Sequence, residues 1–419
     1  MTISLYPPLG SNSSNTVNTT TNFGGSTVDA FGRLRVSQPY TLFDSENRYA
    51  PDSGIDTSTV TGGSTTYLPN ESTVRMDVTT ASGAEVVRQT FRRFAYQPGK
   101  GLLSLQTFTM NASKAGLRQR IGYFGTQNGA FLQQDEAGIL SFTIRSYTSG
   151  AVDDTRKIAQ SAWNGDKLNG SGASGITLDV TKTQILWFDF EWLGVGNVRC
   201  GFVINGVFIV CHTFYNANLN TAVYMTTAQL PMRWEITNTA GTASASSMKQ
   251  ICCSVMSEGG YEQVSLEQTA RRATKLTTIG NTFLPLISIR MNASKQEAII
   301  IPNRVVVLPV TSQNYEVVLV KNSTLTGASW VTGTFANVDY DVTATAMTTS
   351  ATSILQNNYM VATSQAVTPS NTLQLYNWDL QLGASLAGVS DIYTIGIRTL
   401  DTTPTGDAFG SLTFYDLTI

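Results

Sequence analysis

Two carboxylates spaced two residues apart give this chain its sharpest candidate for chemistry. They are Asp189 and Glu191, in the segment Trp187 to Trp192 (WFDFEW). In a β-strand such residues share one face with Cα atoms roughly 6.5–7 Å apart, so the carboxyl groups can approach the separation of about 5–5.5 Å that retaining glycosidases use. Trp187 would share that face and stack on a sugar ring. The alternative, which we favour, leaves both carboxylates on a solvent or interface face and places Phe188, Phe190 and Trp192 in the core.

Other residues that could do chemistry are few. His212 is the single histidine, which excludes a metal site or catalytic pair built from two histidines, and we expect it to be structural. Asp339 and Asp341 (VDYD) have the oxygen ligands that Ca²⁺ takes, although acidic residues at a strand end are the commoner explanation. The sequence has no CxxC, HExxH, EF-hand or G-x-S-x-G pattern. We therefore expect no enzymatic activity, no metal and no cofactor.

A hairpin is predicted at Arg199 to His212 (RCGFVINGVFIVCH) because Asn205-Gly206 suits a two-residue turn with positive φ at both positions. A loop of that length pairs Cys200 with Cys211 across the ladder, and we expect both to be free thiols packed in a core. The opposite face of the hairpin is apolar as well, since it carries Val203, Phe208 and Val210.

Charge is unusually scarce in this chain. Asp, Glu, Lys and Arg make up 13% of residues and leave a formal net charge of -2, whereas about a quarter is usual. This balance provides no basic surface for nucleic acid, and 42% hydrophobic residues is ample for a folded core. Either other chains cover much of the surface, or Ser, Thr, Asn, Gln and Gly provide its solubility.

Short alternating segments recur along the chain between turns rich in Gly, Asn and Ser, which is typical of β-sandwiches and barrels. We predict an all-β protein with two antiparallel β-sandwich domains, jelly-roll or concanavalin-like, in tandem behind an extended N-terminal arm. The best helix candidate, Tyr261 to Leu276, has a poor apolar stripe and is assigned to a linker. The predicted segments are a polar arm (1–28), a strand and loop (29–60), a first sandwich (61–256), a linker (257–276) and a second sandwich (277–419).

No targeting or membrane segment is expected. Met1 to Gly10 lacks the basic and apolar regions of a signal peptide. The strongest apolar stretch, Ala298 to Val310, is interrupted by prolines and is too short to span a bilayer.

The segment Phe23 to Tyr49 resembles the N-terminal signature of virion structural proteins from tailed bacteriophages, cyanophages among them. The core of this signature is Asp29 to Ser37 (DAFGRLRVS) followed by Tyr40 to Ser45 (YTLFDS). The resemblance covers roughly the first 260 residues. Further similar stretches are Tyr96 to Gln106, Arg120 to Phe124, Glu191 to Val198 and Leu230 to Asn238.

This resemblance implies a non-enzymatic structural component of a virion, assembled in the host cytoplasm from copies of the chain and other virion proteins. We expect a self-associating protein of the tail, collar, baseplate or fibre, with capsid decoration (a cement protein) as the alternative. Within the signature we expect assembly contacts at Asp29, Phe31, Arg33 and Arg35. The other interpretation is that the signature is simply the first strand of the first sandwich.

A function of another class also remains open. The segment from Trp187 is similar in part to the strand of glucanases with a concanavalin-like sandwich, which has acid-x-acid-x-acid spacing. Trp187 occupies the first of those acidic positions, so the similarity is partial. It implies a sandwich that binds or cleaves carbohydrate, with host surface polysaccharide as a partner; neither nucleic acid nor membrane is expected to be one.

Overall fold

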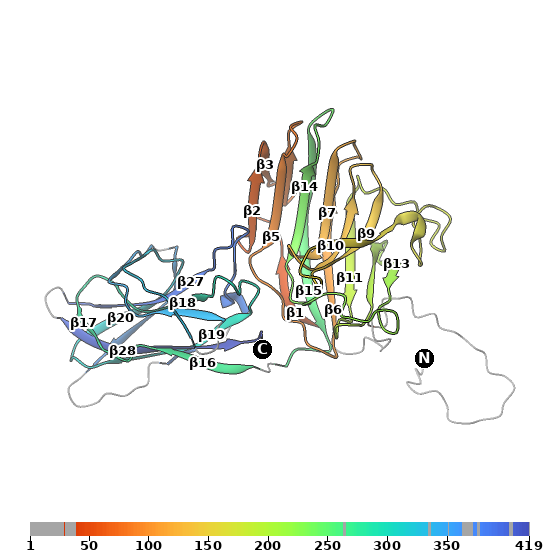
Figure 1. The fold of residues 1–419 in the computed structure, drawn as a ribbon. Coiled ribbons are helices and arrows are strands. Elements are labelled where there is room, and N and C mark those ends of the chain that lie inside the picture. The colour runs from red at the N-terminus through yellow and green to blue at the C-terminus, as the bar shows by residue number, and fades with distance from the viewer. Residues whose placement is uncertain are drawn as a thin grey trace, which may run out of the picture.

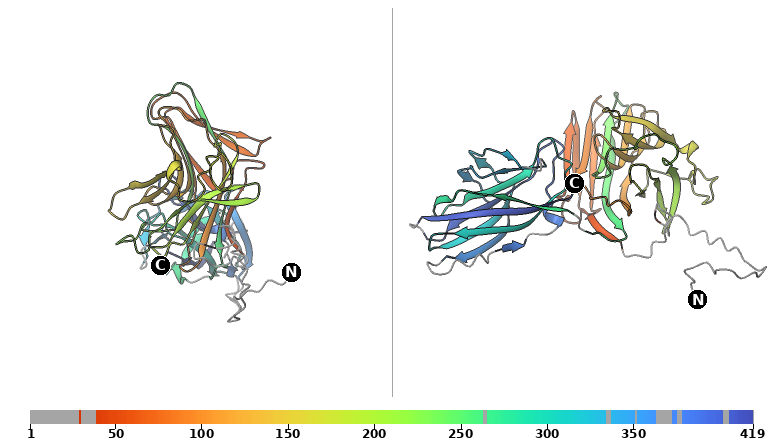
Figure 2. Two further views of the ribbon diagram at one scale, coloured as in Figure 1. Left: turned by 90° about the vertical axis from the view of Figure 1, so that its right-hand side faces the viewer. Right: turned by 60° about the horizontal axis from the view of Figure 1, so that its bottom comes forward.

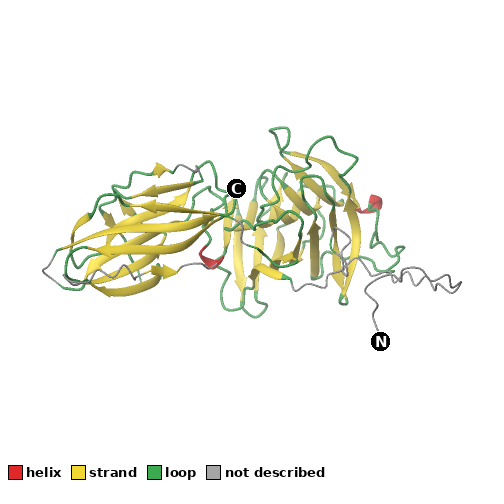
Figure 3. Ribbon diagram, turned by 90° about the horizontal axis from the view of Figure 1, so that it is seen from below, coloured by secondary structure: helices red, strands yellow, loops and turns green. Residues whose placement is uncertain are grey.

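The fold is all-β, as the sequence predicts. The computed structural model describes Asp29 and residues 39–262, 265–333, 337–350, 352–362, 372–374, 378–401 and 405–418. Regular structure in these residues is strand, except for the short 3₁₀ turns η1 (Gln160–Ala162) and η2 (Trp378–Leu380) (Figure 3). None of the described helices is long and apolar enough to cross a membrane. The predicted arm, 1–28, lies outside the described residues.

The first sandwich is built from two antiparallel sheets that face each other (Figure 1). The eight-stranded sheet has, in spatial order, β13 (Val207–Phe214), β12 (Val198–Ile204), β11 (Gln184–Phe190), β6 (Gly101–Thr109), β15 (Ser246–Glu258), β4 (Thr73–Val78) and β3 (Gly63–Leu68), with β1 (Tyr40–Ser45) also paired to β15. The seven-stranded sheet has β10 (Asp153–Ala159), β9 (Leu140–Ser146), β8 (Gly129–Gln134), β7 (Leu117–Phe124), β14 (Met232–Asn238), β5 (Glu85–Thr90) and β2 (Ile55–Val60).

Period-2 alternation places the core between these two sheets. On β11, Phe188 and Phe190 point inward, and on β14 Trp234 and Ile236 do the same; all four belong to one buried cluster. Burying an aromatic side chain of this kind stabilises the fold by roughly 2–3 kcal/mol. Because β1 and β2 pair with β15 and β5, most of the segment predicted as a separate strand and loop, 29–60, is part of this sandwich.

The second sandwich also has two main sheets and a separate core. One sheet has β16 (Leu266–Arg271), β28 (Gly406–Asp416), β19 (Ile300–Pro309) and β26 (Thr372–Gln374), with β17 (Leu276–Ile279) also on β28. The other has β22 (Val331–Thr332), β23 (Val338–Asp341), β18 (Leu284–Met291), β27 (Ile392–Thr399), β20 (Asn314–Lys321) and β25 (Ile354–Val361). A short ribbon is formed by β21 (Leu325–Thr326) and β24 (Ala346–Met347).

The region that supplied the best helix candidate contains a strand instead. Residues Leu266–Arg271 form β16, which pairs along its whole length with β28 and so belongs to the second sandwich. Among the described residues, the connection between the sandwiches is therefore the short stretch after Glu258 and before β16. Pairing with a long buried strand outweighs the modest helix propensity of this sequence.

The predicted hairpin forms, with one correction. Asn205 and Gly206 both have positive φ, 53° and 77°, and Ile204 pairs with Val207 as expected. A β-bulge then shifts the register, so that Cys200 lies opposite His212 and not opposite Cys211. Both cysteines are free and buried in the first core, as predicted.

The two sandwiches lie side by side, and the end of β28 reaches the junction between them (Figures 1 and 2). A small apolar cluster crosses this junction, with Ala95 from the first sandwich against Ile299, Ile301 and Leu417 from the second. Hydrogen bonds cross it as well, including Gln381 Nε2 to the carbonyl of Arg93 at 2.7 Å. The junction is thus packed and hydrogen-bonded, and it fixes the walls of any cavity between the sandwiches.

Candidate functional site

Asp189 is committed to an ion pair within the fold. It lies on β11 on the face turned away from the core, opposite Arg199 of β12, and its side chain is 0% exposed. The guanidinium group of Arg199 donates to Asp189 Oδ2 through Nε, at 3.2 Å, and through Nη2. A carboxylate enclosed in this way cannot reach a sugar in solution, which argues against the alternative in which Asp189 is catalytic. It does not lie on a solvent face either, so that part of the favoured interpretation is corrected.

Glu191 does not form the predicted pair with Asp189 on one strand, because β11 ends at Phe190. Its carboxylate accepts a hydrogen bond from Asn197 Nδ2 at 3.2 Å, which fixes the loop after the strand. Burial raises the pKa of Glu191, and the nearby carboxylates of Asp29 and Asp189 raise it further.

Trp187 is also unavailable to a sugar ring. Its side chain is 1% exposed, and its ring centroid lies 5.7 Å from that of Phe208 on β13. The expectation that Trp187 stacks on carbohydrate is therefore corrected: alternation placed it on the outer face, but the hairpin β12–β13 carries Phe208 over it.

Asp29 packs against its own chain. It is 5% exposed, and it lies with Asp189 and Glu258 around Gly101, where a Cβ added to the glycine would meet all three within 3.6 Å. This burial favours the interpretation that the start of the signature packs on the first sandwich. Phe31, Arg33 and Arg35, the other expected assembly contacts, lie outside the described residues.

The acidic pair of β23 serves the loops beside it and does not form a calcium site. Asp339 is paired with Arg290, and Asp341 accepts hydrogen bonds from the backbone of Ser329, Thr343 and Ala344. Within the part of the chain that the structure describes, no group of three or more acidic, histidine or cysteine residues could hold a metal ion.

Part of the outer face of the eight-stranded sheet is apolar. Six side chains on β13, β12, β11, β6 and β15 are exposed or half-buried and face away from the core. They are Leu105, Ile185, Val203, Phe208, Val210 and Met256. We call this set the apolar face. Asp29 lies at one end of the same sheet face, beside Gly101 of β6.

The outer face of the seven-stranded sheet is different, because guanidinium groups are layered there on aromatic rings. Arg120 and Arg145 lie 5.1 and 5.3 Å from the ring centroid of Phe131. Arg145 makes a bidentate ion pair with Asp154, with both contacts at 2.9 Å. This arrangement pairs scarce charges with one another and leaves few of them for the solvent.

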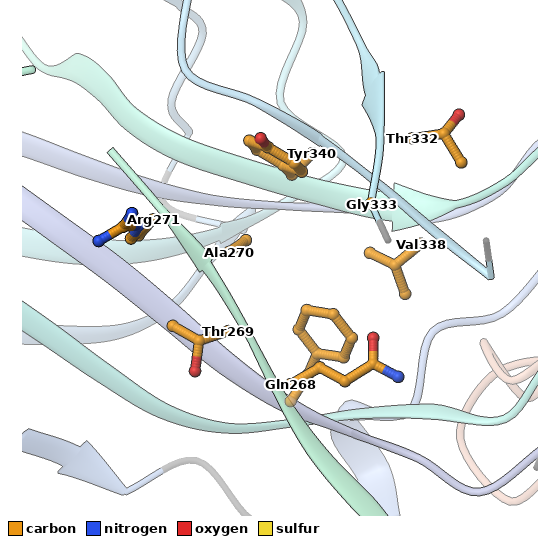
Figure 4. A pocket seen from close by; sticks show the side chains of 9 residues that line it. Gln268, Thr269, Ala270, Arg271, Thr332, Gly333, Val338 and Tyr340 are labelled. Carbon is orange, nitrogen blue, oxygen red and sulfur yellow. The ribbon is translucent and has the colours of Figure 1, made fainter. Parts of the chain in front are cut away.

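A small pocket opens at the edge of the second sandwich, between β16 and the strands β22 and β23 (Figure 4). Its volume is about 260 Å³. The ionisable side chains in its lining are Arg271 and Tyr340, and no carboxylate, histidine or cysteine lines it. The pocket therefore lacks an acid–base pair and is smaller than typical ligand sites.

Two larger cavities lie at the junction of the sandwiches and meet at Thr227, Gln229 and Thr418, which line both. Their volumes are about 530 and 720 Å³. We call them together the junction groove. Sequence reasoning missed this site because its walls come from residues more than three hundred positions apart, which no local pattern connects.

The larger cavity is the aromatic end of the groove. Trp192 and Tyr261 are half-buried in its lining, and Tyr96 supports Trp192 edge-on with ring centroids 5.8 Å apart. The backbone N–H of Trp192 donates to Tyr96 Oη at 3.0 Å, which fixes the position of the indole. The sequence favoured a core position for Trp192; the side chain does pack against the first core, and it also lines this cavity.

The smaller cavity is the polar end of the groove. It is lined by Arg93 and Glu297 together with side-chain amides of Gln89, Gln127 and Gln229. Arg93 is buried and donates through Nη1 to the carbonyls of Thr90 and Phe91, while its Nε has no hydrogen-bond partner among the described residues. Burial raises the pKa of Glu297, and the nearby Arg93 opposes this shift.

Comparison with known proteins finds no matching family model and no matching curated protein. Solved structures with a similar fold include a protein of unknown function from Shewanella oneidensis MR-1, with 13% identity, a TM-score of 0.34, and 57% of this chain and 94% of that one covered. A Bacillus licheniformis β-glucanase has 10% identity and a TM-score of 0.33, covering 52% of this chain and 98% of that one. A legume lectin-like domain from Entamoeba histolytica has 11% identity and a TM-score of 0.32, covering 54% and 100%. At these values the similarity says nothing of a ligand or activity for this chain.

Proposed function

We propose that this chain is a non-enzymatic structural component of a tailed-phage virion. In this proposal it associates with a second copy of itself through the apolar face and attaches to the particle through residues 1–28. Its position would be in the tail, collar, baseplate or fibre. The resemblance of the segment from Asp29 to Ser45 to the virion signature supports this role.

The observation that carries the self-association is the apolar face. Its six side chains form an apolar surface that runs from the edge strand β13 across the sheet to β15, and such surfaces commonly mark protein–protein contacts. A second copy fits it best, because an identical sheet face is complementary in polarity and closes a two-fold contact. Residues 1–28 precede Asp29, which packs at the end of the same face, and in this proposal they contact neighbouring subunits.

The environment of Asp189 supports a non-enzymatic role over a glycoside-cleaving one. A retaining glycosidase needs two carboxylates on opposite sides of a bound sugar. Here one of the two candidates is fully enclosed with Arg199, and the other lies in a loop bonded to Asn197.

Deletion of residues 1–28 tests the attachment. We expect the shortened chain to keep the circular dichroism spectrum and unfolding transition of the full chain, because the described sheets begin at Tyr40. When supplied to particles that lack the full-length chain, it should not be incorporated. The matched control is the full chain with Ile139→Asp, a change at an exposed turn of the other sheet, which should be incorporated normally. Normal incorporation of the shortened chain would contradict the proposed attachment.

A further inference from the structure

The junction groove has walls that are held in place before any ligand arrives. The backbone N–H of Leu386, from the second sandwich, donates to Asp56 Oδ2 of the first at 2.7 Å, and that of Ala384 donates to the carbonyl of Phe91 at 2.9 Å. Together with the apolar cluster around Ile299, these contacts fix the two sandwiches on both sides of the groove. A pre-formed cleft at a domain junction is a common place for a ligand site, because little ordering entropy is lost on binding.

The aromatic end of the groove offers the faces of two aromatic side chains. Trp192 and Tyr261 are half-buried, so part of each side chain remains accessible. The indole Nε1 of Trp192 is itself buried, so the accessible part of this side chain is apolar. Such a surface suits a ligand with apolar patches, for example the faces of sugar rings.

The polar end has hydrogen-bonding side chains that are positively charged, negatively charged and neutral. Glu297 forms no hydrogen bond or ion pair with any described residue, although it is half-buried, and it lines the cavity together with Arg93. A half-buried carboxylate without partners is destabilising unless a ligand donates to it. Gln127 and Gln229 add amide groups that can both donate and accept, which matches the dual character of a hydroxyl group.

The charges that line the groove nearly balance, which favours a ligand of little net charge. Glu297 offsets Arg93 at the polar end, Lys100 and Glu262 offset each other at the aromatic end, and the exposed Lys295 adds one positive charge at the polar end. Arg233 is already paired with Glu235 through a contact of 2.6 Å. An acidic ligand would have to approach the unpaired carboxylate of Glu297.

We propose that the junction groove binds a segment of a neutral polysaccharide. Sugar rings pack against Trp192 and Tyr261, and ring hydroxyl groups donate to Glu297 and accept from the side-chain amides of Gln127 and Gln229. This activity goes beyond the proposed assembly role and uses different residues, since none of the apolar face lines the groove. It also differs from the site expected in the sequence, which lay at Trp187, Asp189 and Glu191.

Isothermal titration calorimetry with neutral gluco-, manno- and galacto-oligosaccharides tests this inference on the full chain. We expect one of the three probes to bind. Glu297→Ala and Gln127→Ala should each weaken that binding by about tenfold, because each removes hydrogen bonds made by a well-placed polar group. Glu267→Ala, at an exposed position on β16, is the matched control and should bind as the wild type does.

The oligomeric state is measured on the same samples, so that failure of glycan binding and failure of assembly are distinguished. Loss of binding in the two groove variants with an unchanged oligomer supports the inference. Three outcomes overturn it: no binding of any neutral probe by the wild type, equal binding by the wild type and both groove variants, or binding of an acidic polyuronate probe alone.

Discussion

At the scale of single residues, the spacing of Asp189 from Glu191 suits a catalytic pair, but the ion pair of Asp189 with Arg199 gives it a structural role in the first sandwich. Its partner Arg199 is nearly as enclosed, with 12% of the side chain exposed. A buried charge pair matters most when one partner is removed, because the other charge is then left without compensation in a medium of low polarity.

We therefore predict that Asp189→Ala lowers the free energy of unfolding of the first sandwich by about 3–5 kcal/mol. The matched control is Glu71→Ala, which removes half of an exposed pair with Lys249 and should lower it by less than about 1 kcal/mol. Urea unfolding followed by tryptophan fluorescence measures both. An Asp189→Ala chain as stable as the wild type would contradict the structural role, and a polysaccharide-cleaving activity lost in that variant would restore the enzymatic one.

Residue types alone predicted part of the environment of β11. Alternation correctly placed Phe188 and Phe190 in the core. It could not show that Trp187, on the second face of β11, is covered as well. The covering side chain, Phe208, belongs to β13, which lies two strands away from β11 in the sheet. For the same reason Trp187 is enclosed, whereas Trp192 packs against the first core as expected and also lines a cavity.

At the scale of elements, the hairpin β12–β13 shows how far local sequence determines register. Asn205-Gly206 set the turn and the first pairs correctly, since positive φ at both residues is a local property. The bulge between Cys200 and Gly201 could not be predicted from the turn, because an extra residue in a ladder is not specified by the turn residues. Its consequence is that His212, and not Cys211, lies opposite Cys200.

The same bulge accompanies a buried histidine. His212 is 6% exposed, and its Nδ1 accepts a hydrogen bond from the backbone N–H of Asn164 at 3.2 Å. Burial, reinforced by the positive charge of Arg156, lowers the pKa of His212 from 6.5 to about 4. Between these two pH values the unfolded chain binds a proton that the folded chain does not, so this residue makes stability fall as the pH falls through that window.

We predict that His212→Asn, whose side-chain oxygen can replace Nδ1 as an acceptor, weakens this dependence. The free energy of unfolding of the wild type should lose on the order of 3 kcal/mol more than that of the variant between pH 7 and pH 4. Carboxylates titrate in both proteins, so the difference between the two curves isolates the histidine. Parallel curves would show that His212 does not titrate on unfolding.

The strand β16 marks another limit of local reasoning. Its sequence, LEQTAR, carries residues that suit a helix, and it becomes a strand through pairing with β28, which follows it by more than a hundred residues. Contacts of such long range cannot be read from a window of neighbouring residues.

At the scale of the whole molecule, several of the few charged side chains are paired with one another and not left to the solvent. On the outer face of the seven-stranded sheet, arginines pair with Asp154 and Glu235 and cover aromatic rings. The opposite sheet presents the apolar face. The fold class could be predicted from turn spacing and alternation. The junction groove could not, because residues of both sandwiches line it and the sequence does not show how the two sandwiches pack.

The central claim is that the apolar face joins copies of this chain. Sedimentation equilibrium of the wild type, of Phe208→Asp and of Ile139→Asp tests it most directly. Val203 and Phe208 are cross-strand neighbours in that face, so a carboxylate there would be desolvated without a partner at the contact. The account predicts a closed oligomer for the wild type and for Ile139→Asp, and a folded monomer for Phe208→Asp. A wild-type chain that remains a monomer up to its solubility limit, or a Phe208→Asp chain that assembles as the wild type does, would contradict it.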